Sequence, residues 1–414
     1  MSRRNAAAES STGRRAFLRG ACVTAGTAAL AGCFGDSGGD GTTDGGPTAN
    51  GTGEGTTGGT DGATTTRNET DGPGRATGSE PGQIGSGRRG RESPGGTPMA
   101  AMPPLEGEIN VYSGRGEALV GELVATIEER YPDLDLEMRY AGANALANQI
   151  VNEGSNSPAD VFFSVNAGAL GLLADENRTQ RLPDGVLEMV PSEFRADEGM
   201  WVGTSGRARS IPYNTEAFEG GAIPEDVFAF PDAERFDGAM GWAPTYSSFQ
   251  GFVTAMRVLD GEGRTREWLR GMVESGITSY SDEFVVAQAI ADGEISAGFT
   301  NHYYPLRVLD GRSDAPLDVA FTRNDAGAVF NVAGGAVVSA TERGEMAANF
   351  VRHLLSAEAQ DYFARATFEY PTVPAVEPVG ALPAIDELAP PEVDLTKLSD
   401  LEPTIDLLRE VGVL

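Results

Sequence analysis

The chain has 414 residues and a formal net charge of −30, from 31 basic and 61 acidic residues. This acidity, with no basic stripe, disfavours nucleic-acid binding and would repel an anionic lipid surface. Cysteine occurs only at Cys22 and Cys33, so the chain after Cys33 can form neither a disulfide framework nor a thiolate metal site.

The start of the chain carries the features of an export signal. Arg14 and Arg15 precede an apolar run at residues 21–31, which is shorter than the roughly 20 residues of a membrane span. The arginine pair resembles a twin-arginine signal within a leader at residues 1–33. The end of this leader resembles a lipobox, which implies lipidation of Cys33 and attachment to the outer face of the cell membrane. The alternative is an arginine-rich disordered start with a chance cysteine.

The next segment has the composition of a linker. Residues 34–104 consist mainly of Gly, Thr, Ser, Asp and Pro, with almost no large apolar side chains. Such a segment cannot bury enough apolar surface to offset the entropy that is lost on ordering. We therefore predict a disordered linker that ends where a folded domain begins, at residue 105.

The acidic excess lies in the folded part of the chain, and Lys397 is the only lysine. An acidic surface with so little lysine resembles that of haloarchaeal proteins, which keep a strongly hydrated surface in concentrated salt. A GC-rich genome would also favour arginine over lysine, but it would not produce the acidic excess. The resemblance implies a protein that folds and works in high salt.

The periodicity of the folded part predicts an α/β domain. Strands are expected at residues 109–112, 134–140 and 160–165, in alternation with helices at 117–130, 143–153 and 167–175. This order favours a parallel sheet with crossover helices, in which ligands sit at the carboxyl ends of the strands. The later pattern predicts strands at 240–243, 295–300 and 332–339, and helices at 249–259, 284–292, 342–355, 357–367 and 404–411.

Several short segments together resemble the ferric-ion-binding type of extracellular solute-binding protein. They are residues 111–115, 158–163, 205–209, 288–294, 301–304, 325–328 and 369–371. The resemblance implies the type II periplasmic-binding fold, with a ligand cleft between two lobes. Lobe 1 would span residues 105–205 and 330–380, and lobe 2 would span residues 206–329 and 381–414. It also implies a monomer without catalytic activity that delivers its ligand to the permease and ATPase subunits of an ABC importer.

The resemblance assigns the metal to tyrosine side chains. Tyr303 and Tyr304 match two adjacent tyrosines that coordinate iron in the family, and Tyr246 matches a third tyrosine of some branches. Fe³⁺ is a hard cation that favours anionic oxygen such as phenolate, and three phenolates would balance its charge. The alternatives are ordinary core packing for the adjacent pair at a strand end and a surface loop position for Tyr246.

Two metal ligands of some family members are missing from this chain. The first loop has no histidine at residues 113–116, and Val165 stands where some members have a glutamate. A synergistic anion, such as carbonate or phosphate, would fill the remaining positions on the metal. We expect Arg115 to clamp this anion, because a guanidinium group binds flat oxyanions with two parallel hydrogen bonds.

Further anion contacts are expected around the tyrosines. The candidates are Ser247 and Ser248 with the amides of their helix start, Asn301 and Arg207, although Arg207 could equally form a structural ion pair. Glu283 stands near an anion-contacting asparagine of the family. A carboxylate there would repel an anion, so its role is left open.

Neither histidine, His302 nor His353, is expected to bind the metal. The sequence therefore predicts a lipid-anchored binding protein that captures ferric iron outside the cell. The same fold could instead bind thiamine, a polyamine or an oxyanion. A polyamine site would favour carboxylates and aromatic boxes, and an oxyanion site would need no tyrosine pair. A secreted enzyme is disfavoured, since the chain shows no nucleophile elbow, HExxH motif or Walker loop.

Overall fold

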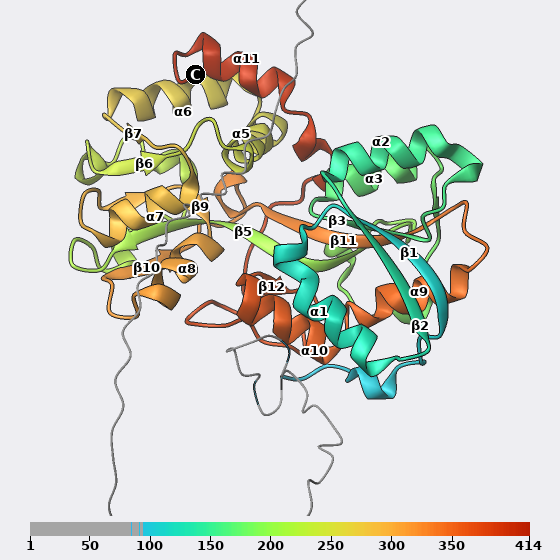
Figure 1. The fold of residues 1–414 in the computed structure, drawn as a ribbon. Helices are drawn as coiled ribbons and strands as arrows, with labels where there is room; N and C mark the ends of the chain where they lie inside the picture. Colours follow the sequence, from blue (N-terminus) through green and yellow to red (C-terminus); the bar gives the residue numbers. More distant parts are fainter. Residues whose placement is uncertain (1–83, 85–90, 92–93) are drawn as a thin grey trace, which may run out of the picture. The chain divides into compact units, whose positions relative to one another are not determined.

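The computed structural model describes Ile84, Arg91 and residues 94–414. The predicted export signal with Arg14 and Arg15, the predicted lipidation site Cys33 and most of the predicted linker lie outside the described residues. Figure 1 shows the described part as two α/β lobes that are joined by long strands.

Lobe 1 is built on a parallel sheet. Its first strands are β1 (Gly107–Ser113), β2 (Leu134–Tyr140) and β3 (Val161–Ser164), and β1 pairs in parallel with both of the others. The connecting helices are α1 (Glu117–Arg130), α2 (Ala143–Glu153) and α3 (Ala167–Asp175). The predicted alternation of strand and helix is confirmed in this part of the chain. It forms because β3 is buried along its whole length, while α1 buries one apolar face.

Two long antiparallel strands connect the lobes. The first half of β5 (Val202–Asn214) pairs with β11 (Phe330–Val338), which also lies beside β3 in lobe 1. The second half of β5 pairs with β10 (Leu317–Ala320) in lobe 2. The short strands β4 (Thr179–Gln180) and β12 (Tyr370–Pro371) pair with β11 and β5, respectively. Because β5 belongs to both lobes, a bend in this strand would change the angle between them.

Lobe 2 contains a second parallel sheet. β6 (Met240–Trp242) lies between β7 (Thr278–Ser279) and β8 (Ala297–Gly298), and β9 (Thr300–Asn301) pairs with β5. The helices are α5 (Ser247–Asp260), α6 (Glu262–Glu274), α7 (Glu283–Ala291) and α8 (Tyr303–Gly311). α8 begins almost directly after β9. Tyr303 and Tyr304 therefore open a helix, where the sequence pattern had placed them at the end of a strand.

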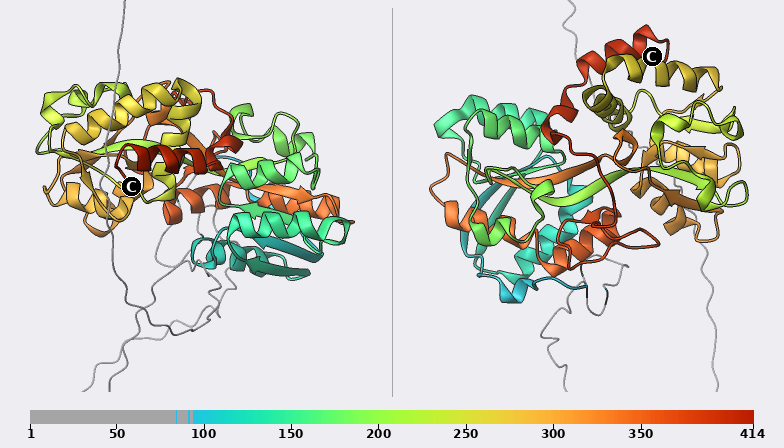
Figure 2. Two further views of the ribbon diagram at one scale, coloured as in Figure 1. Left: turned by 90° about the horizontal axis from the view of Figure 1, so that it is seen from above. Right: turned by 180° about the vertical axis from the view of Figure 1, so that it is seen from behind.

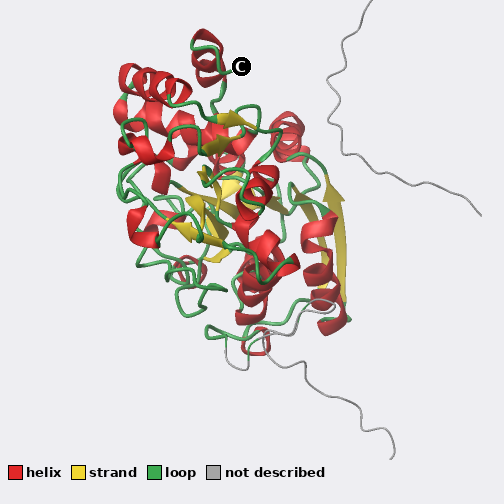
Figure 3. Ribbon diagram, turned by 90° about the vertical axis from the view of Figure 1, so that its left-hand side faces the viewer, coloured by secondary structure: helices red, strands yellow, loops and turns green. Residues whose placement is uncertain are grey.

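The last part of the chain passes from lobe 1 back to lobe 2. Lobe 1 is completed by α4 (Asp184–Leu187), α9 (Gly344–His353), α10 (Ala357–Tyr362) and a π-helical turn at Phe363–Thr367. The chain then crosses through the 3₁₀ helix η9 (Leu395–Ser399), which touches both α3 and α5, and ends in α11 (Glu402–Glu410) against α5. Figure 2 shows this crossing segment, and Figure 3 shows helices on both sides of the strands.

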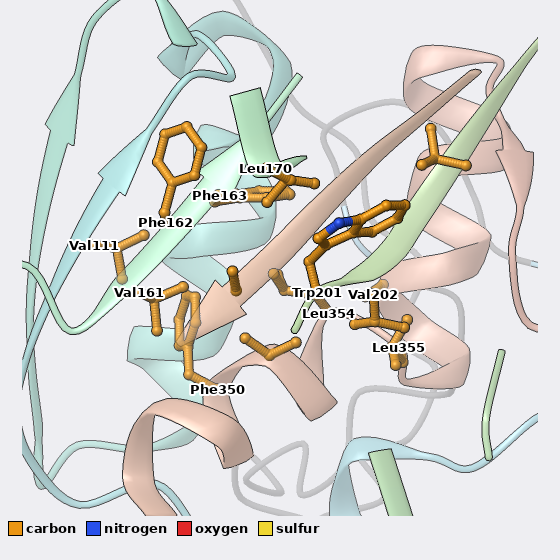
Figure 4. Close-up of a cluster of buried hydrophobic side chains, with 14 of the residues drawn as sticks. Val111, Val161, Phe162, Phe163, Leu170, Trp201, Val202, Phe350, Leu354 and Leu355 are labelled. Atoms are coloured by element: carbon orange, nitrogen blue, oxygen red, sulfur yellow. The ribbon is translucent and has the colours of Figure 1, made fainter. Parts of the chain in front are cut away.

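Each lobe has its own apolar core. In lobe 1, Phe162 and Phe163 of β3 pack with Val202 of β5 and Phe350 of α9, as Figure 4 shows. The core of lobe 2 is rich in aromatic side chains that meet edge to face, tilted or stacked, namely Trp242, Phe249, Phe252, Trp268 and Phe299. Each fully buried side chain of this size stabilises the fold by about 1.5–3 kcal/mol. The two cores therefore make each lobe a rigid support for the loops at its edge.

The described end of the predicted linker packs on lobe 1, which differs from the disorder expected up to residue 104. We call residues 94–104 the strap. Met99 is buried, and its N–H donates to Glu358 Oε2 at 2.8 Å, while the Ala357 N–H donates to the Thr97 carbonyl at 2.8 Å. Arg91, just before the strap, pairs with Asp361 at 2.6 Å. The apolar side chains of this segment follow no helix or strand period, so no periodic pattern marked it as folded.

Candidate metal-binding site

Three tyrosines of lobe 2 lie close together. The hydroxyl oxygens of Tyr246 and Tyr304 lie 2.6 Å apart, and the ring centroids of Tyr303 and Tyr304 are 4.4 Å apart. Tyr246 is the residue before α5, and the other two are the first residues of α8. The structure thus brings together the three residues that were predicted to hold the metal.

Local geometry explains how adjacent tyrosines can share one site. Successive side chains point to opposite faces of a strand, whereas on a helix they are only about 100° apart. The His302 N–H donates to the Ala208 carbonyl of β5 at 3.0 Å, which turns the chain out of β9 and into α8. Tyr246 follows β6, and its N–H donates to the Ala243 carbonyl at 3.0 Å. Both loops follow the carboxyl ends of strands, where α/β folds bind their ligands.

Two of the three tyrosine side chains are largely withdrawn from water, and Tyr246 is partly buried. Tyr303 and Tyr304 are 8% and 5% exposed, and they pack on Val286 and Ile290 of α7. Burial raises the pKa of Tyr246 above its ordinary value, although the hydrogen bond with Tyr304 acts in the opposite direction. Burial, followed by the nearby Tyr303 and Glu283, raises the pKa of Tyr304 strongly. These two phenols are therefore protonated at neutral pH until a cation displaces the protons.

Asn301 links the tyrosines to a buried ion pair. Its Nδ2 donates to the Tyr303 hydroxyl at 3.2 Å, and its Oδ1 accepts from Arg209 Nη1 at 3.2 Å. Its backbone N–H donates to Glu283 Oε2 at 2.8 Å, while Arg209 Nη1 lies 2.5 Å from Glu283 Oε1. Asn301 was predicted at the site, whereas Arg209 was not. Arg209 lies in one of the segments that carry the family resemblance, residues 205–209, but nothing in that segment reveals a partner 74 residues away.

Arg307 is a second residue that the sequence analysis did not select. Its guanidinium carbon lies 5.0 Å from the ring centre of Tyr303 and 5.6 Å from that of Tyr304. Its spacing from the tyrosines brings it over their rings because α8 begins at Tyr303. This contact places a positive charge beside the phenol rings, which favours the presence of negative charge in the site.

The start of α5 provides uncapped hydrogen-bond donors next to Tyr246. Tyr246 occupies the cap position but makes no side-chain hydrogen bond to the helix start. The hydroxyl of Ser248 is buried and has no hydrogen-bond partner among the described residues. Ser247, by contrast, is exposed. An open helix start with a free buried hydroxyl is suited to binding an oxyanion.

Arg115 does not form the anion clamp that was predicted. It is completely buried in lobe 1, where Nη2 pairs with Glu369 Oε2 at 2.7 Å and Nη1 donates to Ser205 Oγ at 2.6 Å. Its guanidinium group also lies against the rings of Phe163 and Phe363. The prediction is contradicted, because a guanidinium group that is enclosed and paired with a carboxylate is not available to a bound anion.

The Arg115 pair holds the segment that leads into β12. Burial alone would raise the pKa of Glu369, but the positive charges of Arg115 and Arg207 and the hydrogen bonds to Ser205 and Arg115 bring it below its ordinary value. Phe368, directly before this glutamate, has a φ of 58°, a conformation that costs energy for a bulky residue. The buried ion pair therefore fixes a strained turn where β12 joins β5.

Arg207 is half-buried and points toward lobe 1, where its guanidinium group donates to the Val165 carbonyl. No contact joins it to the tyrosines in the part of the chain that the structure describes. It therefore stays an untested anion-binding candidate, and its observed bond is structural.

Both histidines are completely buried. His302 Nδ1 accepts from the Ala208 N–H at 3.1 Å, and its ring lies 4.7 Å from that of Tyr370. His353 lies near Tyr131 of lobe 1, with Nε2 at 2.8 Å from the hydroxyl oxygen. Burial lowers the pKa of each imidazole to about 4. The His302 ring also lies edge-on against that of Tyr303, with centroids 5.7 Å apart, and its Nε2 has no hydrogen-bond partner among the described residues. That neither histidine binds the metal therefore stays a prediction.

Among residues 94–414, no three His, Cys, Asp or Glu side chains form a group that could hold a metal ion. No helix in the described range is long and apolar enough to cross a membrane.

The chain belongs to the family of bacterial extracellular solute-binding proteins, whose model matches residues 122–389. This is a family of transport proteins and not an enzyme family. The chain is 31% identical over 323 residues to the major ferric iron-binding protein of Neisseria meningitidis serogroup A, covering 76% of this chain and 96% of that protein.

Two solved structures of relatives share the fold. One is iron-bound HitA from Pseudomonas aeruginosa, with a TM-score of 0.62 and 26% identity over 75% of this chain and 100% of that one. The other is Trichodesmium FutA in complex with iron and citrate, with a TM-score of 0.64 and 25% identity over 74% of this chain and 99% of that one. The predicted periplasmic-binding fold is thereby confirmed.

Proposed function

We propose that this protein captures ferric iron through Tyr246, Tyr303 and Tyr304 as the binding component of an ABC importer. The observation that carries the proposal is the convergence of the three phenols, with two hydroxyl oxygens 2.6 Å apart. Phenolate is a hard anionic ligand, and three phenolates neutralise Fe³⁺. The relatives named above bind iron, which supports the same cargo here.

An oxyanion completes the coordination of the iron in this proposal. The uncapped start of α5 and the Ser248 hydroxyl, which no described residue hydrogen-bonds, support an anion beside Tyr246. Carbonate and phosphate both fit this cradle chemically, and citrate accompanies iron in the Trichodesmium structure. Arg307, which lies over the tyrosine rings, supplies positive charge on the same side of α8.

The proposed location is the outer face of the cell membrane, with a lipid anchor at Cys33. The leader with Arg14 and Arg15 supports export, and a Serratia marcescens relative is described as a periplasmic Fe(3+)-binding protein. The acidic surface fits work in concentrated salt. The partners in this scheme are a membrane permease and its ATPase, to which the iron-loaded protein is presented.

The test is to add Fe³⁺ to the purified metal-free protein and follow the visible charge-transfer band of iron phenolate. We expect a coloured complex, and replacement of Tyr303 and Tyr304 together by Phe should remove both the colour and tight binding. Tyr213→Phe is the control, because this buried tyrosine bonds to Asp318 on β10, away from the site. A protein that stays colourless, or a double variant that binds iron normally, contradicts the proposal.

A further inference from the structure

The ion pair of Arg209 and Glu283 lies directly beneath the tyrosine site. Glu283 is 0% exposed and Arg209 is 4% exposed, and Asn301 lies between them and Tyr303. One carboxylate oxygen accepts from Arg209, and the other accepts from the Asn301 N–H. Both oxygens of this completely buried carboxylate thus accept hydrogen bonds inside the protein.

A buried ion pair of this kind is weak evidence for stability. The cost of removing both charges from water can equal or exceed their attraction, and apolar replacements of similar size are often neutral or stabilising. The contribution of the pair is to hold Asn301 in one position. Its contacts hold Asn301 by the backbone N–H and by the side-chain oxygen at the same time.

The pair also decides which way the Asn301 amide points. Arg209 carries only donors, so the amide must present its oxygen to Arg209 and its Nδ2 group to Tyr303. The Tyr303 oxygen is therefore the acceptor in this bond. An acceptor role suits a phenolate that has lost its proton to a bound cation, because the remaining hydrogen bond stabilises the negative oxygen.

We propose that Arg209 and Glu283 are positioning residues for the metal site, which act through Asn301 on the Tyr303 oxygen. The inference rests on the proposed iron-binding function. It assigns an internal role to Glu283, whose carboxylate would repel an anion if it were free. Because Arg209 neutralises that carboxylate, the pair adds no net charge beside the tyrosines, and an anion can still bind at the start of α5.

The first test is Glu283→Gln in the full-length protein, titrated with Fe³⁺. This variant removes the charge that orders Arg209 and loosens the Asn301 amide. We expect a displaced charge-transfer band and an iron affinity that is about 10- to 100-fold lower, the usual effect of losing an outer partner of a metal ligand. Asp292→Asn is the matched control, because Asp292 ends the same helix and forms an exposed pair with Arg312 at 2.6 Å. It should leave band and affinity unchanged.

Glu283→Gln leaves Arg209 buried without its partner, so this variant could lose stability for a reason unrelated to iron. The second variant therefore combines Arg209→Met with Glu283→Leu, which removes both charges and keeps the volume similar. We expect the double variant to unfold near the temperature of the unmutated protein and still show the displaced band and the weaker binding. Asn301→Ala alone should displace the charge-transfer band as the double variant does. When Asn301→Ala is added to the double variant, the band and the iron affinity should change little further.

The outcomes separate this inference from the proposed function. If the unmutated protein forms no iron band, the function is wrong and the inference is wrong with it. If the unmutated protein binds iron and the folded double variant matches it in band and affinity, the inference alone is overturned. Additive effects of Asn301→Ala and the double variant would also overturn it, because the pair would then act by another route.

Discussion

Tyr246 differs from its two partners in how it is held. Tyr303 and Tyr304 are fixed by α8 and by the apolar cluster with α7, whereas Tyr246 is only partly buried and sits on the loop before α5. Its hydroxyl has one partner among the described side chains, the Tyr304 hydroxyl at 2.6 Å. Tyr246 is therefore the phenol with the greatest freedom to move when a metal arrives.

Tyr246→Phe should weaken iron binding without harming the fold. The change removes one phenolate and its negative charge but keeps the ring that packs edge-on against Tyr304. We expect a weaker and shifted charge-transfer band, a loss of at least tenfold in affinity and a melting temperature close to that of the unmutated protein. Competition with a coloured iron chelator measures the affinity. Equal affinities for the variant and the unmutated protein would exclude Tyr246 as a ligand.

Iron binding should weaken as pH falls. Burial raises the pKa of Tyr246 and Tyr304, so both phenols carry protons at neutral pH and must release them to bind iron. Affinity should therefore fall as pH falls, by about tenfold per pH unit for each proton released. Proton release on addition of Fe³⁺ can be measured in a weakly buffered solution. An affinity that does not change between pH 8 and pH 6 would contradict phenolate coordination.

At the scale of elements, the contact between α3 and η9 depends on two glycines of α3. A Cβ atom at Gly171 would lie 2.7 Å from Thr396 Cβ, and one at Gly168 would meet Ser399 in the same way. The two glycines are three residues apart and thus lie on one face of α3. This face lets η9 approach lobe 1 closely on its way to lobe 2.

Gly171→Ala should destabilise the protein although alanine favours helices. The gain in helix propensity is about 1 kcal/mol, whereas overpacking against Thr396 costs about 1–3 kcal/mol and moves η9 away. Gly251→Ala in α5 is the control. A Cβ atom there lies at ordinary contact distance, 3.7 Å from the Leu398 carbonyl oxygen of the same η9. Urea unfolding should show Gly171→Ala less stable and Gly251→Ala equal or more stable. If Gly171→Ala were the more stable of the two variants, η9 would have to move away from the added methyl group without loss of stability.

Sequence patterns predicted some of these features and missed others for physical reasons. The strands and helices of lobe 1 were predictable because their periodicity is set by local burial, as in β2, where more buried and exposed side chains alternate. The three tyrosines and Asn301 were assigned through the resemblance to the ferric-ion-binding family, because Tyr246 and residues 301–304 match positions in two of its loops. Arg115 was misassigned, because no local pattern shows that Glu369 neutralises it from 254 residues away. Arg209 was missed for the same reason, since its partner Glu283 lies on a different element.

At the scale of the whole molecule, acid should destabilise the fold through its two histidines. Burial lowers the pKa of His353 to about 4, whereas an unfolded histidine has a pKa of about 6.5. The unfolded chain therefore binds more protons between these values, and stability is lost as pH falls from about 6.5 to about 4, by up to about 3 kcal/mol. His302 has a similarly lowered pKa and acts in the same direction.

His353→Gln tests this account of acid sensitivity. Glutamine does not titrate, and its amide can still donate to the Asn349 carbonyl and accept from the Tyr131 hydroxyl, as the neutral imidazole does. The free energy of unfolding, measured with urea from pH 7 to pH 4, should fall less steeply in the variant. An equal fall in the free energy of unfolding with pH in both proteins would show that His353 does not contribute to the acid sensitivity.

The strap is bonded to lobe 1, since Thr97 and Met99 form hydrogen bonds with the start of α10. Lobe 2, which holds Tyr246, Tyr303 and Tyr304, can therefore turn about β5 and β11, the strands that run between the lobes, while the bonds of the strap to lobe 1 stay intact.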